Sequence, residues 1–357
     1  MRAVELFRIR LPLVEPFQTA RSATIHKDAL LVRVVTDDVS GWGEVGAEVA
    51  PTYAPDTLDT ARLVLRDELV PRVFAGVPLD EVRGHHPAQG ALTGALLDAE
   101  LRATGVSLAS HLGGTRPFVD AGVAIGRHAD IAGAVAAAAT FADLGYRSFK
   151  LKIAPGHDVN VVEAIRAEVG ADIGLQVDAN GSYDLADADH LAKLDPLDLV
   201  CFEQPLAPDA LVDHARLAAR LQTPIGLDES ITSPRVARDA IELNACEVVS
   251  IKSGLVGGIT AAGRIHDLCA SSGVAARAGG MLETGVGRAA LLALASLPGF
   301  TVVGDLSASN RYFTNDVTEP FVLDRGRLEV PAGPGLGVTP LPDMLARATI
   351  ARERLTP

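Results

Sequence analysis

The stretch FKLK at residues 149–152 opens a series of similar segments that decides the fold. The later segments read QVDAN at 176–180, FEQPL at 202–206, LDES at 227–230 and IKSG at 251–254. Each combines a short apolar run with polar residues, and stretches long enough for a helix separate them. Strands that alternate with helices in this way predict a parallel sheet with right-handed crossovers, which is an α/β fold.

The same alternation covers the chain from about residue 118 onward. Strands are expected at 149–153, 173–177, 199–202, 224–227, 248–251, 274–276 and 301–303. Helices are expected near 159–168, 186–194, 209–221, 233–243, 260–271 and 287–295. At least seven units of similar length favour closure into a TIM-type barrel over an open doubly wound sheet. No GxGxxG motif follows a strand, and residues 254–258 lack the lysine of a phosphate-binding loop, so nucleotide-binding folds are disfavoured.

The first hundred or so residues follow a different pattern. Residues 3–13 and 29–36 alternate or are rich in β-forming residues, and a turn precedes a third such run at 42–45, which predicts a small antiparallel sheet. Helical patterns follow at 56–73 and 87–104, so this part is expected to form an α+β lobe. The tail after residue 309 is rich in proline and glycine, and we expect it to return to the N-terminal lobe.

Composition excludes several classes of protein. The formal net charge is −13 and no basic stripe is present, so a nucleic-acid partner is not expected. The three cysteines lack metal-binding spacing, which is typical of reduced thiols. Charges interrupt the apolar N-terminal stretch, and the alanine-rich run at 131–144 is too short to span a bilayer. We therefore expect a cytoplasmic protein without membrane contact.

Three acids, Asp178, Glu203 and Asp228, follow consecutive predicted strands. They lie 25 residues apart, which is about the length of one strand–helix unit, so they occupy equivalent heights and converge at the mouth of the barrel. Three facing carboxylates cannot all stay ionised without a cation. Ligation by oxygen alone favours Mg²⁺, with Mn²⁺ as a possible substitute. Any one acid alone could cap a helix or pair with a surface arginine, but three in register argue for a metal site.

Lysines flank the acid series on both sides. The side chains of Lys150 and Lys152 point to the same face of one strand, because the period of a strand is two residues, and Lys252 follows the acids one strand later. A single lysine in a strand is usually an edge or solvent-facing residue. Here we expect mutual repulsion and a nearby cation to lower the lysine pKa values toward the range of a general base.

Lysine bases acting with Mg²⁺ on an ene-diolate are the pattern known for the enolase superfamily. The lysine and acid series resembles the muconate-lactonizing subgroup of that superfamily, and finer motifs resemble its o-succinylbenzoate synthase / N-succinylamino acid racemase branch. The motifs are KLKIAPGHD (150–158), QVDAN (176–180), FEQPL (202–206), LDES (227–230), IKSGLVGG (251–258), GGMLETGVGRA (279–289) and GDLSASNRYF (304–313). The resemblance implies a modified (β/α)₇β barrel at 118–309, with an α+β capping domain built from both termini, 1–117 and 310–357.

The resemblance also implies roles for individual residues. Asp178, Glu203 and Asp228 would hold the metal, Lys152 and Lys252 would act as acid and base on opposite faces of the substrate's α-carbon, and Lys150 would hold the carboxylate and tune Lys152. Further substrate contacts are implied for Phe17, Arg21, Tyr53, Asn180, Gly279, Gly280 and Met281. The implied chemistry is removal of the proton alpha to a carboxylate, giving an enediolate. It leads either to dehydration, as in o-succinylbenzoate synthase of menaquinone biosynthesis, or to racemisation of N-acylamino acids. The expected partner is a small-molecule carboxylate, and the expected assembly a homo-oligomer.

Some positions depart from the branch. Ser253 stands where the family often has proline, and Ala124 where the branch commonly places a serine that contacts the succinyl group. Arg127 and Arg277 are unusual for their positions. Either arginine could meet a second substrate carboxylate, but a surface salt bridge is the favoured interpretation.

Other functions stay open. A muconate-type cycloisomerase shares the lysines and acids, and a dipeptide epimerase is disfavoured because residues 305–307 break the Asp-x-Asp typical of its last strand. A mandelate-racemase-type enzyme would need a late His–Asp pair that this barrel lacks. A Schiff-base aldolase would not need the acids. A non-catalytic binding barrel would gain no stability from a set of mutually repelling charges.

Overall fold

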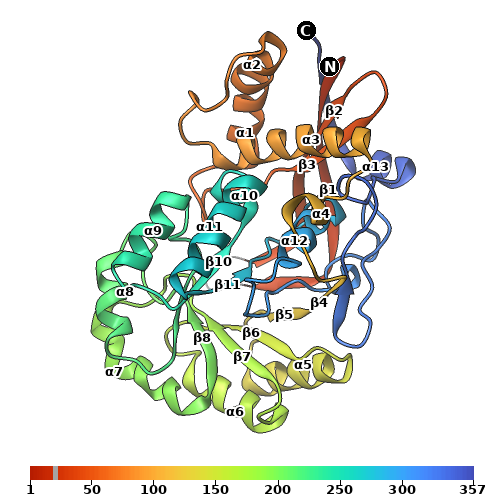
Figure 1. Cartoon of the computed structure of the whole chain (residues 1–357). Helices are drawn as coiled ribbons and strands as arrows, with labels where there is room; N and C mark the ends of the chain where they lie inside the picture. The colour runs from red at the N-terminus through yellow and green to blue at the C-terminus, as the bar shows by residue number, and fades with distance from the viewer. Residues whose placement is uncertain (19–22) are drawn as a thin grey trace.

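Both ends of the chain lie in the upper lobe of the computed structural model, above a curved parallel sheet (Figure 1). The structure describes residues 1–18 and 23–357. In the described residues the upper lobe holds a four-stranded antiparallel sheet in the order β13-β1-β2-β3. Its strands are β1 (Ala3–Gln18), β2 (Ala23–Val35), β3 (Ser40–Glu44) and β13 (Thr349–Leu355). Because the last strand pairs with the first, the predicted return of the tail to the N-terminal lobe is confirmed.

Helices complete the upper lobe. The predicted helix at 56–73 is a continuous helical segment made of α1 (Leu58–Val64), a π-helical turn (Leu65–Leu69) and α2 (Val70–Ala75). The predicted helix at 87–104 is α3 (His86–Thr104), and α4 (Leu108–Leu112) follows it. An α+β lobe built from both termini is therefore present, as predicted.

The lower body is a barrel-like sheet whose described part has seven parallel strands, each beside its neighbours in sequence. They are β5 (Gly122–Ile125), β6 (Ser148–Lys152), β7 (Gly174–Asp178), β8 (Leu199–Glu203), β9 (Ile225–Leu227), β10 (Val248–Ile251) and β11 (Ala275–Ala278). The helices that follow them are α5 (Ile131–Asp143), α6 (Val159–Val169), α7 (Ala188–Leu191), α8 (Leu211–Ala218), α9 (Pro234–Glu242), α10 (Ser253–Val256), α11 (Ile259–Ser272) and α12 (Gly285–Ala295). Two short strands, β4 (Phe118–Asp120) and β12 (Arg327–Glu329), pair with each other, and α13 (Pro342–Ala348) precedes the last strand. The α/β barrel class is confirmed, whereas the domain boundaries at 117/118 and 309/310 stay a prediction.

The predicted strand at 301–303 is wrong. These residues lie in the described part of the chain but form no regular strand, and only Phe300 makes an isolated bridge, to Ala276. The segment still closes the barrel, since the Ser307 hydroxyl donates a 2.9 Å hydrogen bond to the Gly122 carbonyl of β5. A Cβ atom at Gly304 would lie 2.0 Å from the carbonyl oxygen of Ala278 on β11. The Thr301 and Val302 amides both donate to the Ala276 carbonyl oxygen, at 3.1 and 3.2 Å, so the alternating bonds of a regular strand do not form.

The predicted helix at 186–194 is also irregular. Two 3₁₀ turns, Leu185–Asp187 and Ala192–Leu197, flank the four residues of α7. Pro196 lies inside the second turn, and a proline cannot donate the backbone hydrogen bond that would continue an α-helix.

The inner face of the barrel is polar, and this face prepares the site. The register pairs Lys150 with Gln176, and Gln176 with Cys201, so these side chains project from neighbouring strands at one level. The next level along the strands holds Lys152, Asp178 and Glu203. The intervening residues, such as Phe149 and Val177, belong to the apolar core. This alternation follows from the two-residue period of a strand.

The upper lobe docks on the barrel close to the carboxyl ends of the strands. Glu44 at the end of β3 accepts hydrogen bonds from the Thr284 hydroxyl at 2.7 Å and from the Gly287 amide at 3.0 Å, at the start of α12. Gly46 lies against Gly254 of α10, where a Cβ atom on Gly46 would be 2.7 Å from the Gly254 Cα atom. The lobe therefore covers the mouth of the barrel at close backbone contact.

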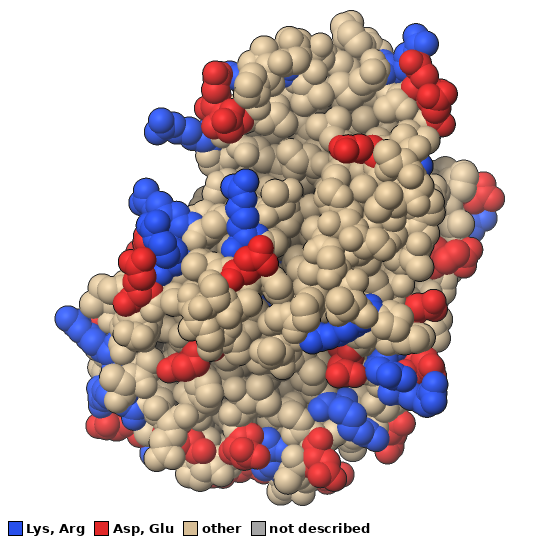
Figure 2. All heavy atoms as spheres, viewed as in Figure 1, with Lys and Arg blue, Asp and Glu red and all other residues tan. Residues whose placement is uncertain are grey.

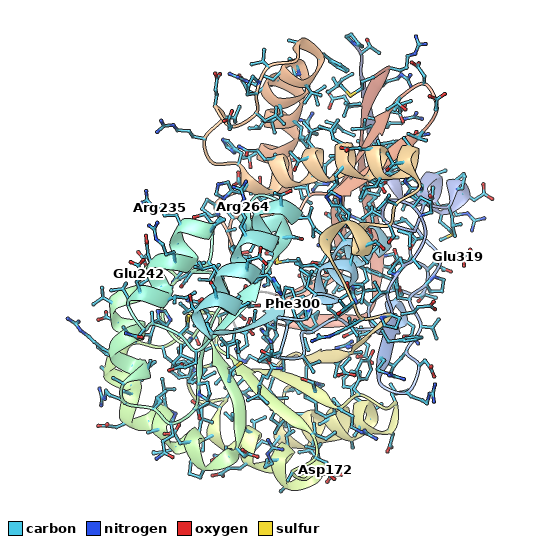
Figure 3. All side chains as sticks on the ribbon, in the orientation of Figure 1. Asp172, Arg235, Glu242, Arg264, Phe300 and Glu319 are labelled. Carbon is cyan, nitrogen blue, oxygen red and sulfur yellow. The ribbon has the colours of Figure 1, made fainter. Side chains whose placement is uncertain are left out.

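The outer surface carries charges of both signs. On the face in Figure 2, acidic and basic side chains are interspersed. Figure 3 shows Arg235 and Glu242 of α9 and Arg264 of α11 on the outside of the barrel, and Asp172 near its lower end, just before β7. Among the described residues, no helix has the length and apolar character needed to cross a membrane. The cysteines Cys201, Cys246 and Cys269 are buried and free, in line with the predicted thiols.

Candidate metal centre and active site

The three predicted acids meet at the carboxyl ends of the parallel strands. Asp178 ends β7, Glu203 ends β8, and Asp228 directly follows β9. One carboxylate oxygen from each lies within 4.8 Å of the others, and all three side chains are buried. The convergence predicted from their spacing is therefore confirmed.

The oxygen atoms of this triad fit a hard divalent cation. Among the described residues, Oε1 of Glu203 and Oδ1 of Asp228 are buried without a hydrogen-bond partner. Burial and the neighbouring Asp178 and Asp228 carboxylates raise the pKa of Glu203 to about 7, although Arg277 and Lys150 act to lower it. A buried acceptor left without a donor costs roughly 1–3 kcal/mol. Ligation by these oxygens would remove that cost, and carboxylate oxygens suit hard divalent cations in general.

Two lysines reach the triad from its two ends. Lys152 donates to Oδ2 of Asp178 at 2.5 Å and to Oδ1 of Asn180 at 2.9 Å. Lys252 donates to Oδ2 of Asp228 at 2.6 Å. Both side chains are buried, and both line one cavity. The two ammonium groups therefore line one cavity, and the three acids lie between them.

Lys150 is held differently, by three carboxylates. Its Nζ atom lies 2.9 Å from Asp305, 3.1 Å from Glu203 and 3.3 Å from Asp178. Asp305 lies in the segment that closes the barrel, and sequence reasoning noted it only as a departure from an epimerase pattern. Its position after the last expected strand was the available signal, because catalytic groups of barrels lie at that end of the strands.

The protein's own groups raise, rather than lower, the pKa values of two of the three lysines, so repulsion between the lysines does not dominate; the lowering expected from a nearby cation stays a prediction. Burial by itself would lower the pKa of Lys150, but Asp305, Glu203 and Asp178 together raise it well above its ordinary value. Burial likewise acts to lower the pKa of Lys252, and Asp228 is the main group that raises it overall. The sequence argument weighed repulsion between lysines and a cation, and it underestimated the attraction of the protein's own carboxylates.

Tyr53 connects the capping lobe to the triad. Its hydroxyl donates a 2.8 Å hydrogen bond to Oδ2 of Asp228 and accepts one from Lys252. The Lys252 ammonium also lies 4.5 Å from the centre of the Tyr53 ring, within the range of a cation–π contact. Burial and the charge of Asp228 raise the pKa of Tyr53 well above its ordinary value, so the hydroxyl stays a donor at neutral pH.

Four of the other residues predicted to contact the substrate line the cavity that contains the two lysines. Phe17, Asn180, Gly280 and Met281 line the same cavity, together with Glu48, Thr52, Ala124, Leu282, Asp305 and Tyr312. Gly279 lies behind it, where a Cβ atom would come within 2.8 Å of Cγ of Lys252. The absence of a side chain at Gly279 therefore leaves room for Lys252. Arg21 lies outside the described residues.

The two unusual arginines differ from each other. The favoured interpretation of a surface salt bridge is wrong for Arg277, which is 1% exposed and contacts Glu203 and Gln176 inside the barrel. Its inward direction follows from the strand period, which was not applied to this position. Arg127 is partly buried, and as far as the chain is described it does not line the cavity. Glu229, which accepts a 2.8 Å hydrogen bond from Asn180, was also missed, although it follows a predicted ligand directly in sequence.

Comparison with known families decides where this chain belongs. Residues 133–344, more than half of the chain, match the family described as enolase C-terminal domain-like. The chain belongs to this family. It is 48% identical to an N-succinylamino acid racemase of an Amycolatopsis species, over 99% of this chain and 98% of that protein. It is 42% identical to the o-succinylbenzoate synthase of Geobacillus stearothermophilus, over 94% of this chain and 92% of that protein. The solved structure of an enolase superfamily member from Listeria innocua matches with a TM-score of 0.95 and 34% identity, over 99% and 98% of the two chains. The resemblance drawn from the motifs is confirmed.

Proposed function

We propose that this protein removes the proton alpha to the carboxylate of a small-molecule substrate, with Mg²⁺ as its cofactor and Mn²⁺ as a substitute. The observation that carries the proposal is the position of Lys152 and Lys252 at opposite ends of a carboxylate triad, within one cavity. Relatives named o-succinylbenzoate synthase and N-succinylamino acid racemase support it. Such a site serves a lyase or an isomerase, because both reactions would begin with removal of the same proton.

In this proposal, Asp178, Glu203 and Asp228 hold the metal ion. When bound, the ion supplies positive charge that stabilises the anion formed by proton removal, which is needed because a lysine alone is too weak a base for such a carbon acid. The ordered contact of Lys152 with Asn180, and of Lys252 with Tyr53, fixes each ammonium group at the cavity wall. Lys150 is then an electrostatic support, since its ion pairs keep it beside two of the three ligands.

The two reactions divide after this first step. For dehydration, one lysine takes the α-proton and returns a proton to the departing hydroxyl group. For racemisation, one lysine takes the proton and the other delivers one to the opposite face of the α-carbon. The presence of lysines at both ends of the triad is compatible with either outcome.

The cavity favours a substrate with an apolar part. Phe17, Met281, Leu282 and Tyr312 contribute apolar surface opposite the charged groups. Such a cavity suits an acyl or side-chain group next to a reacting carboxylate. We also propose that the protein works in the cytoplasm as a homo-oligomer and, if it is the synthase, in menaquinone biosynthesis.

The test measures both reactions on the full-length protein. N-succinyl amino acids are incubated in D₂O and loss of the α-proton signal is followed by NMR, while dehydration of the cyclohexadiene-carboxylate precursor is followed by ultraviolet absorbance. Both are measured with Mg²⁺, with Mn²⁺ and with a chelator. Metal-dependent turnover in either assay is the expected result, and turnover that persists in the chelator would contradict the proposal.

Absence of turnover in both assays would also overturn the assignment to this branch. Lactone formation from muconate would then identify a cycloisomerase, and exchange on dipeptides alone would identify an epimerase.

A further inference from the structure

A permanent positive charge lies inside the barrel beneath the candidate metal ligands. Arg277 of β11 is 1% exposed and is the largest of the fully buried side chains. Its register partner is Ser250 of β10, two residues before Lys252, so its side chain starts below the level of the catalytic lysines. The interior of such barrels is usually filled with bulky branched apolar side chains. A guanidinium group in this place calls for a specific partner, since an unpaired buried charge is very costly.

The partner of Arg277 is a candidate metal ligand. Its Nη2 atom forms an ion pair with Oε2 of Glu203, and its Nη1 atom donates to Oε1 of Gln176. The same Glu203 oxygen lies 3.1 Å from Nζ of Lys150. Two cations therefore face one carboxylate oxygen of Glu203, while among the described residues its other oxygen, Oε1, has no hydrogen-bond partner. Oε2 of Glu203 is thus held by the protein, and Oε1 is available to bind a cation.

Ionisable groups of both signs are buried around the triad. In the described part of the chain, buried carboxylates at Asp178, Glu203, Asp228, Glu229 and Asp305 face buried cations at Lys150, Lys152, Lys252 and Arg277. The lysines can lose a proton, whereas a guanidinium group stays charged in proteins. Arg277 is therefore the group among these four cations whose charge is fixed.

We propose that Arg277 is a positioning residue that keeps the Glu203 carboxylate in place and, through its charge, weakens the binding of a divalent cation at the triad. The inference rests on the proposed function, since it takes the triad to be the metal site. Its reason is electrostatic, because a cation that contacts a ligand carboxylate repels a second cation bound to the same group. Lys150 remains on Glu203 when Arg277 is removed, so the carboxylate keeps one of its two anchors.

The test compares metal binding in the wild type and in Arg277→Met. Isothermal titration of Mg²⁺ and of Mn²⁺ into full-length protein gives the dissociation constants, and thermal unfolding with and without each ion gives the stabilisation on binding. Arg277→Met is expected to bind both ions at least about tenfold more tightly, and its melting temperature is expected to rise more than that of the wild type when an ion is added. Arg277→Lys keeps the charge and is expected to bind within about threefold of the wild type.

A control variant removes a partly buried, multiply bonded arginine elsewhere. Arg166 donates to the carbonyl oxygens of Gly170 and Ile173, both at 2.8 Å, and of Asp198 at 2.9 Å, near the opposite end of the barrel strands. Arg166→Met should lower the melting temperature without changing either dissociation constant. A general loss of stability would affect this control and Arg277→Met alike, whereas the proposed charge effect is confined to Arg277.

The outcomes separate the inference from the proposed function. Unchanged or weaker metal binding in Arg277→Met, with a wild type that binds metal, would overturn the proposed weakening of metal binding by the Arg277 charge and leave the proposed function intact. A wild type that binds neither ion would overturn both. If Arg277→Met folds only when an ion is present, that dependence supports the inference, provided that Arg166→Met shows none.

Discussion

Removal of one hydroxyl group, in Tyr53→Phe, tests how the capping lobe contributes to the chemistry. The Tyr53 hydroxyl donates to Asp228 and accepts from Lys252, so it links a proposed ligand to a proposed acid–base residue. The phenyl ring of the variant would keep the contact with the Lys252 ammonium, which is 4.5 Å from the ring centre. The change therefore removes the hydrogen bonds and leaves the packing.

The magnitude follows from the charged partners of this hydroxyl. A hydrogen bond to a charged group contributes about 1.5–3 kcal/mol. If this is lost in the transition state, kcat/KM for α-proton exchange falls by roughly 10- to 150-fold. The assay is the initial rate of deuterium incorporation by NMR, at several substrate concentrations.

Tyr183→Phe is the matched control for this prediction. The Tyr183 hydroxyl donates to Oδ2 of Asp158 at 2.8 Å, the same distance as between Tyr53 and Asp228, but it lies outside the cavity. This control should lose stability and keep its kcat/KM. A Tyr53→Phe variant within threefold of the wild type would refute the reasoning.

Three further changes test other parts of the structure. Asp228→Asn removes a ligand charge, so the rise in melting temperature on adding Mg²⁺ should disappear; an unchanged rise would exclude Asp228 as a ligand. Gly46→Val places a side chain where a Cβ atom already lies 2.7 Å from Gly254, so stability should fall by about 1–3 kcal/mol and kcat/KM should fall with it; a variant equal to the wild type in both would refute the close docking. Glu5→Gln should cost roughly 1–2 kcal/mol at pH 7, measured by urea unfolding, because its arginine partners are half exposed. Burial acts to raise the pKa of Glu5, but Arg352 and Arg354 outweigh it and hold the pKa below 4.5. The extra stability of the wild type over Glu5→Gln is therefore present above pH 4.5 and is lost as the pH falls through the lowered pKa of the folded protein. A stability difference that persists below that pKa would contradict this.

The convergence of the three acids could be predicted from sequence because they obey a simple geometric rule. Asp178, Glu203 and Asp228 end strands of one parallel sheet, and a constant spacing puts such residues at one height. The same rule placed Lys150 and Lys152 on one face of β6. The two-residue period of a strand is a local pattern, so the few residues of β6 are enough to place both lysines on one face.

The misses have a different physical origin. The segment at 301–303 is rich in β-forming residues, but its backbone contact with β11 at Gly304 depends on the closed barrel. The pKa directions of Lys150 and Lys252 depend on Asp305 and Asp228, which reach them only through the tertiary structure. Arg277 was taken for a surface residue because arginine side chains are mostly exposed, and its partner Glu203 is 74 residues away in sequence. Such pairings between distant residues carry no local pattern.

The central claim is that Lys152 and Lys252 move the proton at the α-carbon. The most direct measurement follows deuterium incorporation into each separate enantiomer of an N-succinyl amino acid, using Lys152→Ala, Lys252→Ala and the exposed-lysine control Lys193→Ala. The account predicts metal-dependent exchange of the wild type and of Lys193→Ala, with exchange lost or confined to one enantiomer in each of the other two variants. Exchange at the wild-type rate on both enantiomers in Lys152→Ala or in Lys252→Ala would contradict it.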